Sequence, residues 1–307
     1  MAIPPSGRQY VITHGDQRAV VTEVGAGLRT YTLAGQDVID GYGEFEMCSV
    51  ARGSALVPWP NRLQDGRFDF GGETHQTAIT EPSRQNAIHG LTRWLNWRGF
   101  QPADNRVTMR LLLHPQEGYP FTLSLAIEYR LSGEGLAVLT TATNLGTKAL
   151  PYGAGHHPYL TVGTDRIDEA LFSFPAALRL ETDERQIPTG RLIPVKNTAF
   201  DFRTAREIGA TQLDTAFTGL SRESDGRVRV RLQAPKGRRA TTLWMDGAHE
   251  YLMVFTGDTI PDPARRRRGL AVEPMTCAPN AFRNGLGLTV LEPDQAITTS
   301  WGLLAGA

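Results

Sequence analysis

The 307-residue sequence has only two cysteines, Cys48 and Cys277, and no net charge. Two cysteines do not build a disulfide framework in a chain of this size, which favours a reducing compartment. Lysine plus arginine and aspartate plus glutamate number 32 each, so a nucleic acid or an anionic membrane would meet no net positive field. No run approaches the roughly 18 apolar residues of a membrane span, and the N-terminus lacks the basic and apolar regions of a signal peptide. These absences predict a soluble, cytoplasmic protein that binds neither nucleic acid nor membrane.

Helical periodicity is also missing. No segment sustains apolar residues at i, i+3, i+4 and i+7 over three turns, so helices should be few and short. Alternation with a period of two is frequent instead: every odd position from Phe121 to Leu131 is large and apolar, and residues 107–113, 227–232 and 297–303 alternate likewise. Glycine (32) and proline (19) together exceed the roughly 12% of average proteins, which suits many short strands and turns.

The chain shows no internal repeat, low-complexity linker or sharp change of composition. We therefore expect residues 1–307 to form a single domain. Sheets of this many strands usually curl or split into two packed layers, so the predicted fold class is all-β, a large antiparallel β-sandwich with few short helices. Asp65-Gly66, between residues 62–64 and 67–70, predicts a two-residue hairpin turn. Monomer and homodimer both remain compatible with the sequence.

Two short motifs carry residues suited to proton transfer. His157 lies in residues 155–160 (GHHPYL) and Glu273 in residues 271–275 (AVEPM), and each directly precedes a proline. Proline disfavours the helical region for the residue before it, so both should lie on extended backbone. Glu273 has apolar neighbours, where burial would raise its pKa and a nearby protonated histidine would lower it. The pair is a general base and a general acid on one interpretation, and a structural histidine and a salt-bridged glutamate on the other.

Four further polar residues are candidates for binding: Asn61 and Arg62 after two prolines, His89 before a glycine, and Asp214 after a leucine. Taken singly, Arg62 is better explained as a surface residue that closes a turn and His89 as a satisfied core side chain, while Asp214 could equally be a turn or capping residue. His156 and His157 could form a metal pair, but adjacent strand residues point to opposite faces. No cluster with zinc-type spacing accompanies them, so we expect no metal site.

The run from Arg265 to Arg268 follows Pro261-Asp262-Pro263. We expect a solvated loop. Contact with a phosphate or an acidic sugar is the alternative, because arginine binds oxyanions bidentately.

From about Val11 to Leu303 the sequence resembles the aldose 1-epimerase (mutarotase) family, in particular its bacterial branch. Six short motifs match in the family's order, namely residues 58–62 (PWPNR), 89–91 (HGL), 118–121 (GYPF), 157–159 (HPY), 273–275 (EPM) and 279–282 (PNAF). The resemblance implies a supersandwich with a sugar-binding cleft across one sheet. It also implies an isomerase that interconverts the α and β anomers of a free glucose- or galactose-like aldose, with no cofactor.

The same resemblance implies roles for single residues. Glu273 matches the general base and His157 the general acid, and the pH–rate profile would then have an acidic limb from Glu273 and a basic limb from His157. Arg62, His89 and Asp214 match positions that hold sugar hydroxyls, and Asn61 shares the motif of Arg62.

Some questions stay open at this point. His156 replaces an asparagine of the best-known branch, which leaves the sugar preference open. An epimerase of hexose phosphates or other unusual sugars, a non-catalytic sugar-binding protein and a two-carboxylate glycoside hydrolase remain as alternatives.

Overall fold

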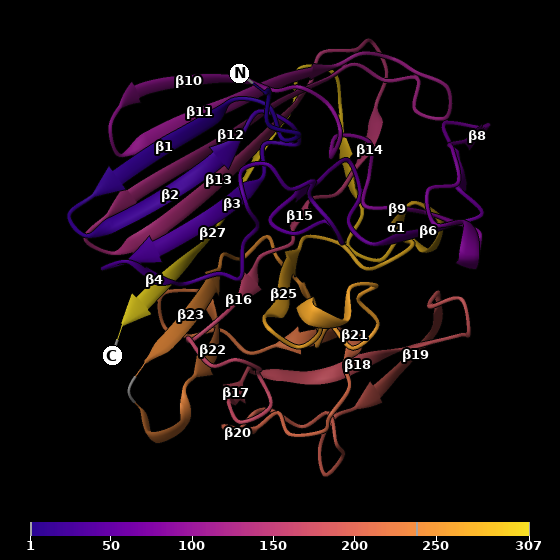
Figure 1. Cartoon of the computed structure of the whole chain (residues 1–307). Helices are drawn as coiled ribbons and strands as arrows, with labels where there is room; N and C mark the ends of the chain where they lie inside the picture. The colour runs from indigo at the N-terminus through magenta and orange to yellow at the C-terminus, as the bar shows by residue number, and fades with distance from the viewer. Residues whose placement is uncertain (1, 238, 307) are drawn as a thin grey trace.

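The computed structural model describes residues 2–237 and 239–306, and it is built almost entirely from antiparallel strands (Figure 1). The strands form one nine-stranded sheet, one eight-stranded sheet, one four-stranded sheet and three two-stranded ribbons among the described residues. The prediction of a large antiparallel β-sandwich with few short helices is therefore confirmed.

The nine-stranded sheet is centred on the C-terminal strand. Its order is β10 (Arg98–Ala103), β11 (Arg106–Leu113), β12 (Leu123–Ser132), β13 (Gly135–Asn144), β27 (Ala296–Gly306), β23 (Ala240–Met245), β22 (Val228–Gln233), β17 (Leu171–Ser173) and β20 (Arg206–Glu207). The alternation predicted for residues 121–131 appears in β12, where every second side chain is buried. Because β27 pairs with both β13 and β23, the end of the chain joins the two halves of the sheet.

The eight-stranded sheet carries the candidate site. Its order is β19 (Pro188–Pro194), β18 (Ala176–Thr182), β21 (Asp214–Leu220), β24 (Tyr251–Phe255), β25 (Leu270–Met275), β15 (Gly155–His156) and β5 (Ala55–Leu56), and β16 (Tyr159–Leu160) also pairs with β25. All six residues of β25 are buried, so this strand lies at the centre of the layer.

Smaller elements complete the fold. The four-stranded sheet consists of β1 (Gln9–His14), β2 (Gln17–Thr22), β3 (Leu28–Leu33) and β4 (Gln36–Asp37), and β1 lies against β11 and β12 (Figure 1). The ribbons pair β6 (Arg62–Gln64) with β9 (Asn86–Ile88), β7 (Arg67–Phe70) with β8 (Glu73–Gln76), and β14 (Leu150–Tyr152) with β26 (Thr289–Leu291). Helical turns occur as α1 (Ala281–Asn284) and as 3-10 turns at Pro82–Arg84, Pro235–Gly237 and Pro263–Arg265.

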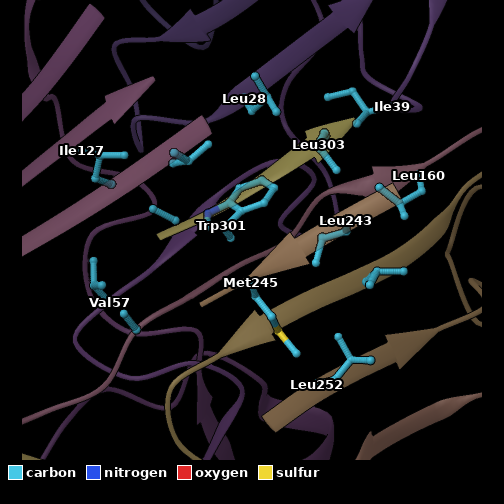
Figure 2. Close-up of a cluster of buried hydrophobic side chains, with 14 of the residues drawn as sticks. Leu28, Ile39, Val57, Ile127, Leu160, Leu243, Met245, Leu252, Trp301 and Leu303 are labelled. Atoms are coloured by element: carbon cyan, nitrogen blue, oxygen red, sulfur yellow. The ribbon is translucent and has the colours of Figure 1, made fainter. Parts of the chain in front are cut away.

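A hydrophobic core fills the space between the sheets. Figure 2 shows Trp301 of β27 and Leu243 of β23 in this core, together with Leu28 of β3 and Leu252 of β24. All four side chains are at most 1% exposed, and burying one such side chain contributes about 1.5–3 kcal/mol. Side chains from all three large sheets thus belong to one core.

The predicted hairpin at Asp65-Gly66 is wrong in its pairing. Both residues have the positive φ, 58° and 60°, that a type I′ turn requires. However, β6 pairs with β9, and β7 pairs with β8. The N–H of Gln64 donates to the side-chain oxygen of Asn280 at 3.0 Å instead of to β7. The local turn is right, but a distant side chain takes the hydrogen bond.

The predicted solvated loop at the four arginines is also wrong in part. Arg267 is buried and forms an ion pair with Asp258 at 2.8 Å, and Arg265 pairs with Glu46 at 2.5 Å. Arg266 and Arg268 are the exposed members of the run, and the side chain of Arg268 is 53% exposed. Among the described residues, no helix is long and apolar enough to cross a membrane.

Candidate active site

All six residues singled out in the sequence line one cavity of about 300 Å³. They come from five separate segments: Asn61 directly before β6 and Arg62 at its start, His89 after β9, His157 between β15 and β16, Asp214 at the start of β21, and Glu273 in β25. This volume is at the lower end of the range for small-molecule sites, which suits a small ligand.

His157 and Glu273 meet in this cavity. The backbone of His157 is held by the loop that directly precedes β5. The N–H of His157 donates to the carbonyl of Ser54 (3.1 Å), and the carbonyl of His157 accepts from the N–H of Gly53 (2.9 Å). His157 Nε2 lies 3.4 Å from Glu273 Oε1, longer than a good charge-assisted hydrogen bond. Glu273 Oε2 and His157 Nδ1 are buried with no hydrogen-bond partner among the described residues. Both side chains can therefore act on a third group in the cavity.

Burial shifts the pKa values of the pair in opposite directions. Burial raises the pKa of Glu273 to about 8, an effect that Asp214 adds to and Arg62 opposes. Burial, together with the positive charge of Arg52, lowers the pKa of His157 to about 3. Neither group favours its charged form, so the pair holds one proton between its two members around neutral pH. A nitrogen and an oxygen that share a single proton can deliver it at one atom and take it up at another.

His89 is fixed by two reciprocal hydrogen bonds to Asn61. The N–H of Asn61 donates to His89 Nδ1 (3.2 Å), and the N–H of His89 donates to the carbonyl of Asn61 (2.9 Å). A backbone N–H can only donate, so Nδ1 is the acceptor and the ring proton lies on Nε2. Burial lowers the pKa of His89 well below its usual value, which keeps the ring neutral. His89 thus offers the cavity an Nε2–H donor.

The backbone around His89 explains the glycine that follows it. Asn61 and His89 both have positive φ, 55° and 63°, and Gly90 continues at 67°. A Cβ at Gly90 would lie 2.1 Å from the carbonyl oxygen of Val57, so only glycine fits this approach.

Arg62 is oriented by an acidic residue that the sequence analysis missed. Its Nε and Nη2 donate to the two carboxylate oxygens of Glu81 at 2.9 and 3.0 Å, a bidentate arrangement. Asp214 lies 3.9 Å from both Arg62 and Arg84. Glu81 directly precedes a proline, as Glu273 does, so the same pattern in the sequence indicates Glu81 as a candidate.

The site also holds a set of possible metal ligands. His89, His157 and Glu273 place one ligand atom each within 4.8 Å of one another. Nδ1 of His89, however, accepts the N–H of Asn61, and its Nε2 carries the proton. Neither nitrogen offers a metal a lone pair unless this hydrogen bond breaks. His89, His157 and Glu273 are therefore better suited to hydrogen bonds with a hydroxylated ligand than to metal coordination.

His156 points away from the cavity, as the alternation of strand side chains predicts. Its Nε2 lies 2.9 Å from the hydroxyl of Thr140, and its ring packs on Trp301 with the centroids 5.1 Å apart. His156 is therefore a core residue, and the predicted opposite orientation of the two histidines is confirmed.

Comparison with known proteins agrees with this geometry. The family model described as aldose 1-epimerase matches residues 8–302. The chain belongs to the aldose 1-epimerase family. It is therefore an isomerase of the mutarotase type. The uncharacterized protein YihR of Escherichia coli strain K12 is 35% identical over 288 residues, which cover 94% of this chain and 90% of YihR.

Other relatives of the family have printed activities. The galactose mutarotase of Homo sapiens is 28% identical over 193 residues, which cover 60% of this chain and 55% of that protein. The maltose epimerase of Levilactobacillus brevis is 24% identical over 323 residues, which cover 94% of this chain and 92% of that protein. These names differ in the sugar, so they leave the substrate of this enzyme to be proposed.

Solved structures share the fold. The aldose epimerase homologue of C. elegans has a TM-score of 0.86 at 18% identity, covering 97% of this chain and 98% of its own. The galactose 1-epimerase of Lactobacillus acidophilus has a TM-score of 0.79 at 20% identity, covering 96% and 93%.

Proposed function

We propose that the enzyme interconverts the α and β anomers of a free, neutral aldose that resembles glucose or galactose. The observation that carries this proposal is the pairing of His157 Nε2 with Glu273 Oε1, 3.4 Å apart in the cavity. Membership of the family and the mutarotase names of relatives support the type of reaction. The reaction uses no redox step, so we propose that it needs no cofactor.

In this proposal Glu273 is the base and His157 the acid. Glu273 takes the proton of the anomeric hydroxyl while His157 gives a proton to the ring oxygen, and the bond between C1 and the ring oxygen breaks to leave the aldehyde. Rotation about C1–C2 presents the other carbonyl face, and the two transfers run backwards to close the ring. The order of the two pKa values places the shared proton on Glu273 in the empty cavity. The transfers therefore start from the form in which this proton has moved to His157, and ring opening returns it to Glu273.

The remaining cavity residues are proposed to hold the sugar hydroxyls. The Nε2–H of His89 donates to a hydroxyl oxygen, and Asp214 accepts from a hydroxyl. Arg62 is held by its bidentate pair with Glu81, so its remaining terminal nitrogen meets the ligand in one orientation. Asn61 contributes chiefly by fixing His89, although its own side chain also lines the cavity.

A second candidate substrate is an aldose with an anionic substituent, such as a hexose phosphate. Arg93 favours it, because this arginine lines the cavity and forms no ion pair among the described residues. Burial lowers the pKa of Arg93, which an anionic ligand would offset. The Arg265–Arg268 run offers no such support, since none of its members lines the cavity.

The test is polarimetry of freshly dissolved α-D-glucose and α-D-galactose with the wild type, Glu273→Gln and His157→Asn. We expect acceleration by the wild type and a loss of kcat of about 10²-fold or more in each variant. Glu134→Gln, at an exposed turn and with no ion pair to any residue that the structure describes, is the control and keeps the wild-type rate. Substantial turnover by Glu273→Gln would refute its role as the base.

The same assay separates the candidates. If hexose phosphates or uronic acids are turned over better than neutral sugars, and Arg93→Gln removes only that advantage, the second candidate replaces the first. Binding of a sugar, seen by calorimetry, without acceleration of any of them would indicate a non-catalytic sugar-binding protein.

A further inference from the structure

His157 lacks the support that usually orients a catalytic histidine. Such a residue generally donates its second ring N–H to a carboxylate or a carbonyl, which fixes the ring and its tautomer. Nδ1 of His157 is buried and has no partner among residues 2–237 and 239–306. The orientation of its imidazole must therefore come from packing.

The packing partner is Tyr159, two residues along the chain. The rings of His157 and Tyr159 are stacked, with an interplanar angle of 16° and centroids 5.1 Å apart. The guanidinium of Arg52 lies over the Tyr159 ring at 4.0 Å from its centroid. Side-chain contacts thus run from Arg52, which lies outside the cavity lining, through the Tyr159 ring to the imidazole of His157, which lines the cavity.

Arg52 is a buried and firmly held cation. Its side chain is 2% exposed, and its Nη1 donates to the carbonyl of Asp40 at 2.9 Å and to the carboxylate at 2.5 Å. Its Nε and Nη2 have no acceptor among the described residues. Burying a guanidinium with two unpartnered nitrogens costs free energy unless another attraction offsets it. The face of the Tyr159 ring, which lies under the guanidinium, supplies a cation–π attraction.

Tyr159 is held at both ends. Its hydroxyl donates to the carbonyl of Val50 (3.4 Å), and its own carbonyl accepts from the N–H of Asp40 (2.8 Å). The loop that carries Arg52 also forms two backbone hydrogen bonds with His157. The carbonyl of Ser54 accepts from the N–H of His157, and the N–H of Gly53 donates to the carbonyl of His157. One short loop therefore fixes both the backbone and the ring plane of His157.

Building on the proposed function, we propose that Arg52 and Tyr159 are positioning residues for His157. The Tyr159 ring holds the imidazole plane toward Glu273, and the charge of Arg52 favours release of the proton from the imidazolium. Charged or titratable groups close to His157 are Glu273, His89, Arg93 and Arg52, and of these Arg52 has the largest lowering effect on its pKa after burial itself. A ring oxygen is a weak base, so the imidazolium, once it has formed, protonates the ring oxygen faster when it is more acidic.

The first experiment compares Tyr159→Leu with Tyr159→Phe. Leucine removes the stacking surface, whereas phenylalanine keeps both faces of the ring and loses only the hydroxyl. We expect Tyr159→Leu to lower kcat by about tenfold or more through lost orientation, and Tyr159→Phe to restore most of the rate. Equal kcat in Tyr159→Leu and the wild type would overturn the proposal.

The second experiment removes the charge of Arg52 without leaving Asp40 unpaired, using the double variant Arg52→Met with Asp40→Asn. We expect the pKa of His157, followed by NMR of its ring nitrogens, to rise. We also expect kcat to fall about tenfold, because the Tyr159 ring loses the guanidinium that lies over it and orients His157 less well. KM should stay within about twofold, because Arg52 does not line the cavity. Arg206→Gln is the matched control, since Arg206 lies over the Phe202 ring at 3.7 Å, outside the cavity lining.

The outcomes separate this proposal from the proposed function. If the wild type does not interconvert any anomers, the proposed function fails, while the NMR titration still tests whether Arg52 acts on His157. If the wild type is active and Glu273→Gln is not, but the double variant has unchanged kcat and an unchanged His157 pKa, only the positioning role fails. A loss of thermal stability alone, with kcat and the titration intact, also overturns it.

Discussion

Replacing Glu273 with glutamine should stabilise the folded protein while it removes turnover. The carboxyl is 2% exposed among apolar neighbours, and burial raises its pKa from an ordinary value of 4.5 to about 8. Between these two pH values the unfolded chain has lost the proton and the folded chain still keeps it. The wild type therefore loses unfolding free energy as the pH rises through this window. Glutamine has nearly the same shape and no charge to lose.

The size of the effect follows from the width of the window. Each pH unit costs the wild type about 1.4 kcal/mol, so the difference between the proteins grows to something on the order of 5 kcal/mol at pH 8 and above. Below pH 4.5 both side chains are neutral and the two stabilities should agree. For a chain of this size, about 2 °C of melting temperature corresponds to each kcal/mol, so we expect a gain of about 10 °C at pH 8.

Denaturation by urea and by heat, measured from pH 4 to pH 9, tests this reasoning. The signature is a stability difference that is absent in acid and increases with pH. Glu134→Gln, which changes an exposed glutamate, should track the wild type throughout. A difference that does not vary with pH, or a Glu273→Gln protein that is less stable than the wild type at pH 8, would show that Glu273 is not held neutral by burial.

Two further predictions concern activity. The pH profile of kcat/KM should be flat from about pH 4 and fall above about pH 8, since the basic limb reports loss of the proton that His157 and Glu273 share. A fall centred near pH 6.5 would point to an ordinary exposed histidine instead. His89→Asn should raise KM about tenfold with kcat within about threefold, because it removes one hydrogen-bond donor from bound sugar and no proton-transfer group. Initial rates at several sugar concentrations separate the two parameters, and a pure loss of kcat would contradict this role of His89.

Much of the fold was predictable because it follows from short-range patterns. Alternation at residues 121–131 predicts a strand whose buried face can be read directly from the sequence, and β12 has that face. The pairing of strands depends on distant partners, as at Asp65-Gly66, where Asn280 takes the hydrogen bond of the first strand. The shared core of the three large sheets supports our proposal that residues 1–307 form one domain.

The site was predictable where a residue's chemistry and its backbone constraint coincide. Glu273 and His157 precede prolines, and both line the cavity. The protonation behaviour was not predictable, because it depends on burial. An acidic limb from Glu273 and a basic limb from His157 follow from ordinary pKa values, whereas burial reverses the order of the two values. Arg52 was missed because it acts through Tyr159 and carries no motif of its own.

Asp40 gives the four-arginine run a role that the sequence could not suggest. Its carboxylate pairs with Arg52 and also lies 3.9 Å from Arg265 and 3.8 Å from Arg268. Two arginines of the run thus add positive charge close to Asp40, and neither of them lines the cavity. The contacts of Asp40 with Arg52 use only Nη1 of the guanidinium, which leaves the guanidinium face free to lie over Tyr159. We therefore expect the run to influence His157 only indirectly, through Asp40 and Arg52, since none of its members lines the cavity.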